Sequence, residues 1–407
     1  MSDPGRRRAL AAFETRSFRF QWPADLLTSW ALEMELLILG WYVLTSTGSV
    51  FLLTVIGSLH FGGTLLSPWF GTLADRVSRR RLLVTLRAAY AACAAILAGL
   101  ELTGSLAVWH VFAIALVAGL LRPADLVLRN ALVADTVPGE HLANAMGLAR
   151  TTVDSARIAG ALAGAGLFAL IGFGPAYAVV AAFHAASAVL TAGVAAGTAR
   201  VVGSTWSELK LGFLHVRDAP VLWCMMWLAF QVNLTAFPLS HGLLPYVARD
   251  VYGVDAIGLG HLSAAYAAGA MAGSLLVAWH GRSTGVARTV VIGTCAWYLL
   301  LLVAAHTESK AAGLAVLAGI GLAQSLSMVA MSIALLANTP FEFRGRVMGL
   351  RALAIYGLPL GLLAGGALIE LIGFRAQTTL YALVGLAATL AISWRWRAEL
   401  WRKQDFS

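Results

Sequence analysis

The stretch GTLADRVSRRRLL, from Gly71 to Leu83, is a short basic segment between two long apolar ones. Upstream, Val50 to Phe70 contains no Asp, Glu, Lys or Arg, and it is long enough to cross a bilayer at about 1.5 Å per residue. Downstream, Leu82 to Leu100 is nearly as apolar. Because Arg-rich short loops stay on the cytoplasmic side of a membrane, the basic segment predicts an inside face.

The composition agrees with a chain that crosses a membrane many times. Of the 407 residues, 59% are hydrophobic and 12% are charged, whereas soluble domains contain about 25% charged residues. The net charge of +9 reflects basic loops, and we expect no nucleic-acid partner. The apolar stretches predict twelve spans, at about 18–45, 49–74, 82–101, 106–133, 143–171, 175–198, 219–248, 258–281, 287–306, 311–337, 346–371 and 376–394.

The distribution of basic residues orients these spans. With Gly71 to Leu83 inside, most of the 29 Lys and Arg residues fall in the tails and in the loops on that side. The opposite loops hold only Arg249, Lys310 and Arg375. This imbalance predicts that both termini are cytoplasmic.

The order of spans predicts two six-helix bundles. Residues 1–17 form a cytoplasmic lead-in, 18–198 the first bundle, 199–218 a linker, 219–394 the second bundle and 395–407 a cytoplasmic tail. In the linker, apolar residues recur at helical spacing and predict an amphipathic helix on the inner membrane surface. Ala131 to Arg150 can be laid over Ala334 to Arg351, and LIGF occurs at both Leu170 and Leu371. The halves are therefore predicted to be pseudo-symmetric, with a substrate site between them.

The basic segment resembles the signature between spans two and three of the major facilitator superfamily, roughly G-x-L-x-D-R-x-G-R-[RK]-x-x-L. Ser78 replaces one glycine, and the matching residues are Gly71, Leu73, Asp75, Arg76, Arg79, Arg80 and Leu83. The resemblance implies an all-α membrane protein of the major facilitator fold. Pro138 to Ala145 and Arg344 to Val347 resemble the branch that contains the enterobactin exporter and the macrolide efflux proteins. That branch implies a bacterial inner membrane.

The resemblance also implies a cytoplasmic gate. In the superfamily the signature Asp meets a second-half helix and an Arg of the fourth span, which gives gating roles to Asp75, Arg76 and Arg129. The second half lacks an equivalent basic segment, so the contact is expected near Arg344 and Arg346. The alternative is that the arginines only enforce orientation.

Two predicted spans carry charges at helical spacing, Arg122, Asp125 and Arg129 in the fourth and Arg150, Asp154 and Arg157 in the fifth. Charge inside a membrane is costly and marks either a neutralised packing network or a functional site. We expect the two ladders to share one wall, with Arg122 and Arg157 contacting a substrate anion and Asp125 and Asp154 beside them. The packing interpretation stays open.

The first span holds three acids, Asp25, Glu33 and Glu35. Carboxylates removed from water can load and release protons during transport. Glu33 is the first candidate for proton coupling, followed by Glu35 and Asp25, and a fixed ion pair is the alternative. Glu33 and Glu35 lie about 200° apart on the helix, so they face different neighbours.

Uncharged polar residues occur in other spans. Gln231, Asn233 and Gln324 are candidates to line the second-half wall, as is Trp30 in the first half, and helix-to-helix hydrogen bonding is the alternative for the amides. The midspan residues His60, His184 and His241 have two interpretations, a proton relay or a neutral imidazole bonded to a neighbouring helix.

The residues show no phosphate loop, no nucleophile constellation and no metal-ligand spacing, so the sequence predicts neither an enzyme nor a cofactor or metal site. We expect a monomeric secondary transporter that works by alternating access in the lipid bilayer and exports a small or amphipathic organic molecule against protons. Superfamily antiporters carry a proline in a Gly-rich fifth span, and this fifth span has none. An organic-anion or metabolite carrier is the first alternative, and a transporter-like receptor the second.

Overall fold

The computed structural model describes residues 11–63, 78–195, 206–280 and 285–400. These residues are helical with short connections, and no strand occurs among them. Most of the basic segment, residues 71–77 with Asp75 and Arg76, lies outside the described residues.

Helices occupy all twelve predicted spans. Ten helical segments of the described chain are long and apolar enough to cross a membrane. An eleventh helix, α12 (Ala256–His280), occupies the predicted eighth span and is rich in small Ala and Gly residues. The start of the second span forms α3 (Val50–Gly62), beyond which residues 64–77 are not described. The predicted fold class, an all-α membrane protein of twelve spans, is confirmed.

The chain divides into two compact units. Unit 1 comprises residues 1–42 and 62–204, and unit 2 comprises residues 43–61 and 205–407. The change of unit after residue 204 falls inside the predicted linker. Residues 43–61, by contrast, belong to the first predicted bundle in sequence but group with unit 2.

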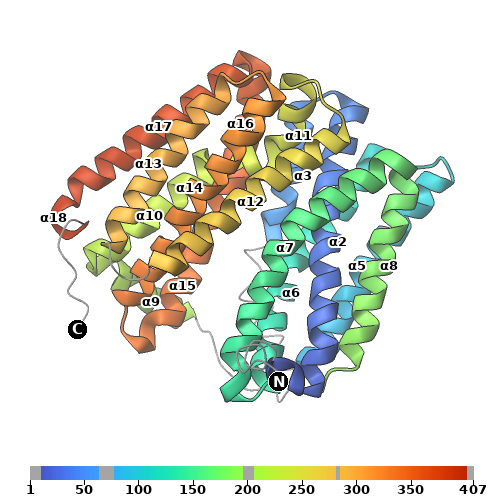
Figure 1. Ribbon diagram of the computed structural model, residues 1–407, viewed down its shortest axis with the longest axis horizontal. Helices are drawn as coiled ribbons and strands as arrows, with labels where there is room; N and C mark the ends of the chain where they lie inside the picture. The colour runs from blue at the N-terminus through green and yellow to red at the C-terminus, as the bar shows by residue number, and fades with distance from the viewer. Residues whose placement is uncertain (1–10, 64–77, 196–205, 281–284, 401–407) are drawn as a thin grey trace, which may run out of the picture. The chain divides into compact units, whose positions relative to one another are not determined.

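The described part of unit 1 consists of long helices preceded by a short 3-10 helix, and Figure 1 labels the long ones. Their bounds are η1 (Ala11–Glu14), α2 (Arg16–Thr47, shared with unit 2), α5 (Arg79–Leu102), α6 (Val108–Thr136), α7 (Gly139–Ile171) and α8 (Phe173–Ala192). α5 packs along α8 and also contacts α6. The lead-in is part of the bundle, because Ala12 of η1 is buried with Phe18 and Val133 and donates its backbone N–H to Asn144 Oδ1 at 3.0 Å.

Unit 2 holds α3 and the remaining helices. Their bounds are α9 (Trp206–Asp218), α10 (Pro220–Thr235), η3 (Leu239–Leu243), α11 (Leu244–Tyr246), η4 (Val247–Val251), α12, α13 (Val286–Ala305), α14 (Lys310–Ala337), η5 (Phe341–Phe343), α15 (Arg344–Leu353), η6 (Ala354–Tyr356), α16 (Gly357–Ile372), α17 (Phe374–Arg395) and α18 (Arg397–Leu400). The helix that starts at Pro220 continues to Val251 through two π-helical segments, η3 and η4, which follow Pro238.

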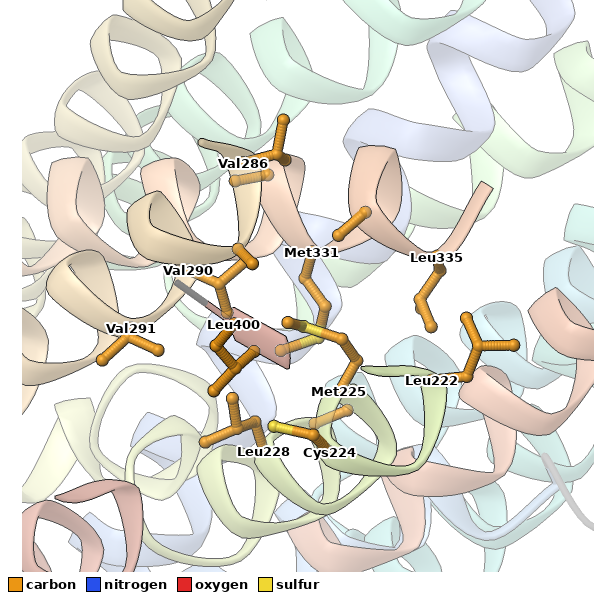
Figure 2. Close-up of a cluster of buried hydrophobic side chains, with 14 of the residues drawn as sticks. Leu222, Cys224, Met225, Leu228, Val286, Val290, Val291, Met331, Leu335 and Leu400 are labelled. Atoms are coloured by element: carbon orange, nitrogen blue, oxygen red, sulfur yellow. The ribbon is translucent and has the colours of Figure 1, made fainter. Parts of the chain in front are cut away.

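The core of unit 2 is assembled where α10, α13 and α14 meet. Figure 2 shows Met225 and Met331 pointing toward each other, with Leu228 and Val290 beside them. Leu400 of α18 lies in the same cluster and is 2% exposed. The C-terminal helix therefore belongs to the packed core of this unit.

The two LIGF repeats form the same junction. Gly172 joins α7 to α8 with φ +80°, and Gly373 joins α16 to α17 with φ +81°. Each glycine ends one helix and begins the next in a conformation that L side chains rarely adopt. The repeat found in the sequence therefore corresponds to a repeated turn.

Candidate functional site

A buried network of two acids and two arginines links the helices of unit 1. It joins Asp25 of α2, Arg87 of α5, and Asp125 and Arg129 of α6, and each of these residues is at most 5% exposed. Arg129 Nη2 donates to Asp125 Oδ2 at 2.6 Å, and Arg87 Nε donates to Asp125 Oδ1 at 3.4 Å. Arg87 also donates to Asp25, whose Oδ1 lies 3.7 Å from Arg129 Nε.

Hydrogen bonds to neighbouring groups extend this network. Arg87 Nη1 donates to Thr191 Oγ1 of α8 at 2.5 Å, and Arg129 Nη1 donates to Ser29 Oγ at 2.9 Å. Two carboxylates against two guanidinium groups make the network electrically neutral. Buried charges are tolerated when they are paired and hydrogen-bonded, and these contacts connect α2, α5, α6 and α8.

A second polar cluster contains Glu35 of α2, Tyr90 of α5, and Tyr177 and His184 of α8. His184 is fully buried, both tyrosines are 1% exposed, and Glu35 is 7% exposed. His184 Nε2 lies 3.5 Å from Glu35 Oε1, within ion-pair range but without hydrogen-bond geometry. The rings of Tyr90 and His184 are tilted, with centroids 5.2 Å apart.

Several polar atoms of this cluster have no hydrogen-bond partner among the described residues. They are both ring nitrogens of His184 and the hydroxyls of Tyr90 and Tyr177. Leaving such a group unsatisfied costs about 1–3 kcal/mol. Unsatisfied polar atoms beside a carboxylate and an imidazole mark a site that can bind and pass a proton.

Glu33 faces another neighbour, as its position on the helix predicts. Glu33 is half-buried on the side of α2 that packs against α7. A Cβ added at Gly160 of α7 would lie 3.0 Å from the Cβ of Glu33 and 3.1 Å from the carbonyl oxygen of Trp30. The same close approach continues at Gly164 against Met34. Within the described part of the chain, Glu33 forms no ion pair.

The two predicted charge ladders differ in their surroundings. Asp125 and Arg129 face α2 and α5, whereas Asp154 accepts from Arg150 on its own helix at 3.1 Å, with Arg150 62% exposed. Among the described residues, no ion pair of Asp125 or Asp154 connects the two charge ladders. Arg122 and Arg157 are half-buried, and neither pairs with another described residue. Arg122 Nη1 is buried without a partner.

The predicted polar residues of unit 2 make hydrogen bonds between and within helices. Gln231 Nε2 donates to the carbonyl of Gly385 and to Thr389 Oγ1, both at 2.6 Å, which joins α10 to α17. Asn233 Nδ2 donates within α10 to the carbonyl of Ala229 at 2.8 Å. Gln324 Oε1 accepts from the hydroxyl of Tyr266, which joins α14 to α12. This geometry favours the packing interpretation for all three amides.

The predicted gating residues fall in three places. Asp75 and Arg76 are outside the described residues, and Arg129 is in the buried network. On unit 2, Arg344 Nε donates to the carbonyl of Thr339 at 3.3 Å, and the Arg346 guanidinium lies 5.2 Å from the centre of the Phe343 ring.

Sequence reasoning missed Arg87, Tyr90 and Tyr177. Arg87 lies only eight residues after Arg79, a position that suggests the basic inner face, yet it is fully buried. Asp25 could have indicated a buried arginine, because a buried carboxylate needs a cation at a similar depth in the membrane. The tyrosines had no such signal, since nothing in their spacing separates them from packing residues.

The geometry defines a bundled helical membrane protein with neutralised charges in its interior. The Major Facilitator Superfamily model matches residues 24–359, which is most of the chain. The chain belongs to this superfamily and is therefore a multi-pass membrane transporter. No curated protein shows a significant sequence match.

Solved transporters share the fold at low sequence identity. The nucleoside transporter NupG (D323A mutant) is 14% identical over 92% of this chain and 98% of its own, with a TM-score of 0.73. A POT family transporter in complex with 5-aminolevulinic acid is 11% identical over 95% and 97%, with a TM-score of 0.74. The human organic anion transporter MFSD10 is 17% identical over 96% and 100%, with a TM-score of 0.65. These likenesses concern the fold alone.

Proposed function

We propose that this protein is a secondary active transporter that exports a small or amphipathic organic molecule in exchange for protons, with Glu35 and His184 as the proton-binding pair. The observation that carries the proposal is the 3.5 Å approach of a buried carboxylate and a buried imidazole. Within the described part of the chain, His184 is the only basic side chain paired with Glu35. The pair can therefore change its charge without breaking a guanidinium bridge.

The contrast with Asp25 supports this choice. Asp25 contacts two guanidinium groups, and a proton on its carboxylate would weaken both contacts, so it is suited to packing. Glu33, the first candidate from sequence, faces α7 and has no titratable partner among the described residues. It remains the alternative proton carrier.

The test begins with a thermal-shift screen of organic molecules on the purified protein, followed by flux of the hits in proteoliposomes. We expect flux to accelerate when the proton gradient opposes the solute gradient and to lose this dependence in Glu35→Gln. Glu33→Gln is the matched control on the same helix and should keep it. Gradient-dependent flux in Glu35→Gln that is lost in Glu33→Gln would assign the proton to Glu33.

The unpaired arginines favour a second candidate, an organic-anion carrier. Arg122 Nη1 is buried and has no hydrogen-bond partner in the part of the chain that the structure describes, and a guanidinium in that state is suited to a carboxylate or phosphate of a substrate. Lysine keeps the charge but loses the planar fork. We expect Arg122→Lys to raise the KM of an anionic substrate about tenfold or more, the loss of one charge-assisted hydrogen bond. Arg150→Lys, on an exposed residue, is the control, and an unchanged KM in Arg122→Lys would argue against anion contact.

The remaining parts of the proposal follow from the sequence. Basic residues on one side of the membrane support cytoplasmic termini. The resemblance to the exporter branch supports a location in the bacterial inner membrane. The protein is proposed to act as a monomer by alternating access. Asp75 and Arg76, with Arg344 and Arg346, are proposed to close its cytoplasmic side.

A further inference from the structure

Unit 2 contains an apolar groove of about 360 Å³ between α9, α10 and the segment from α15 to η6. Its aromatic wall is built edge to face, because the ring centres of Phe213 and Trp223 lie 5.8 Å apart and those of Trp223 and Trp227 lie 5.9 Å apart. Leu350 and Leu353 form the opposite wall. The lining contains no charged side chain.

The wall of this groove is partly open. Trp227 is 47% exposed, Phe213 44% and Leu353 38%. Large apolar side chains that stay exposed side by side mark a binding surface. Unlike the clusters of unit 1, this surface offers its ligand apolar area and no charged side chain.

Positive charge borders the groove on α9. Lys210 precedes Phe213 by three residues and Arg217 follows it by four, so both lie on the helix face that carries Phe213. Both are exposed. Asp218 lies 3.5 Å from Arg217, but this exposed pair is weak and leaves the face net positive. The groove is thus apolar inside and cationic at its edge.

We infer that this groove binds the acyl chain of an anionic phospholipid, with the lipid head group at Lys210 and Arg217. An amphipathic helix with basic residues beside its apolar face is the usual binder of anionic lipid surfaces. The orientation predicted from the sequence puts α9 at the inner leaflet, where such lipids are available. The apolar lining of the groove binds the acyl chain of the lipid, and the two cations favour a negatively charged head group. The inference does not depend on which molecule is transported.

The experiment uses the full chain in vesicles of phosphatidylcholine with a minority of phosphatidylglycerol. Bromine, which quenches tryptophan on contact, is placed on the phosphatidylglycerol chains in one sample and on an equal amount of phosphatidylcholine in the other. The contribution of the groove is the quenching that disappears in W223F/W227F. Since each basic residue adds about 1 kcal/mol to anionic-lipid binding, we expect this contribution to be about threefold or more larger with brominated phosphatidylglycerol.

Two variants complete the test. The quenching ratio is the groove contribution with brominated phosphatidylglycerol divided by that with brominated phosphatidylcholine. K210Q/R217Q should reduce this ratio to about one, because the groove then binds acyl chains without regard to head-group charge. Trp109, which is 66% exposed at the start of α6 in unit 1 and has no Lys or Arg beside it in sequence, supplies the control, and W109F should remove equal quenching from both samples. The inference would be overturned by a wild-type quenching ratio of one, or by a ratio that stays high in K210Q/R217Q. It would also be overturned if neither brominated lipid quenched the fluorescence of Trp223 and Trp227.

Discussion

At the scale of single residues, two acids on α2 show how surroundings divide roles. Asp25 and Glu35 are both buried on the same helix. Asp25 lies between Arg87 and Arg129, while Glu35 lies beside His184. A guanidinium keeps its charge at all physiological pH values, whereas an imidazole does not. The first acid therefore has a fixed partner and the second has one that can change charge with it.

The first prediction concerns Arg87. Removing it leaves Asp25 and Asp125 with one buried cation between them, so Arg87→Ala should lower the free energy of unfolding by about 3–5 kcal/mol. Arg81→Ala is the control, since Arg81 is exposed on the same helix. Thermal melting of the solubilised protein measures both, and equal melting temperatures for the two variants would show that the network does not stabilise unit 1.

The sequence predicted part of this residue-scale arrangement. Helical spacing separated Glu33 from Glu35 and put Asp125 one turn from Arg129, because both relations depend only on the local helix. The pairing of Glu35 with His184 depends on how α2 packs against α8. No local pattern contains that information, so the order of the first-span acids could not be settled from the sequence.

At the scale of elements, Glu370 of α16 caps the start of α3. Its Oε1 accepts from Ser49 Oγ at 2.8 Å and from the backbone N–H of Phe51 at 3.1 Å. A carboxylate at a helix start satisfies free N–H groups and complements the helix dipole. Residues 43–61 are thereby held within unit 2.

We expect Glu370→Gln to destabilise the docking of α3 by about 1 kcal/mol. Hydrogen exchange at the amides of residues 49–52 measures this directly and should accelerate. Glu308→Gln is the control, because Glu308 forms an exposed pair with Arg375 that contributes little. Unchanged exchange in Glu370→Gln would show that Ser49 alone caps the helix.

Glycines set the distance between α12 and α14. A Cβ at Gly321 would lie 2.0 Å from the carbonyl oxygen of Tyr266, and one at Gly269 would lie 1.9 Å from that of Ala318. Backbone cannot move aside as a side chain can, so Gly321→Ala should destabilise unit 2 by about 2 kcal/mol or more. Gly166→Ala has no atom within 4 Å of its new methyl group and should be neutral or stabilising. Melting temperatures in the opposite order would contradict this packing.

Apolar length predicted the elements well because a bilayer fixes the length of a spanning helix. All twelve spans contain helix, and the amphipathic helix of the linker starts at Trp206. The π-helical segments after Pro238 could not be predicted, since a π-turn leaves no periodic signal in the sequence. The same holds for the groove beside α9, whose walls come from three distant segments.

At the scale of the whole molecule, the sequence repeat predicted two related halves. The matching glycine junctions at Gly172 and Gly373 agree with that repeat, since both have a positive φ of about the same size. The grouping of residues 43–61 with unit 2 was not predictable. A sequence repeat indicates that two halves are related, but it does not indicate which half a given segment packs against. The same limit applies to substrate and direction, which depend on groups from separate helices.

The central claim is that solute and protons move in opposite directions through this protein. The most direct measurement follows the internal pH of proteoliposomes, with a trapped pH-sensitive dye, when a transported solute is added outside. Antiport predicts that the lumen becomes alkaline as solute enters, and that Glu35→Gln abolishes the change while still binding the solute. A constant internal pH during solute entry, or an acidified lumen, would contradict the account.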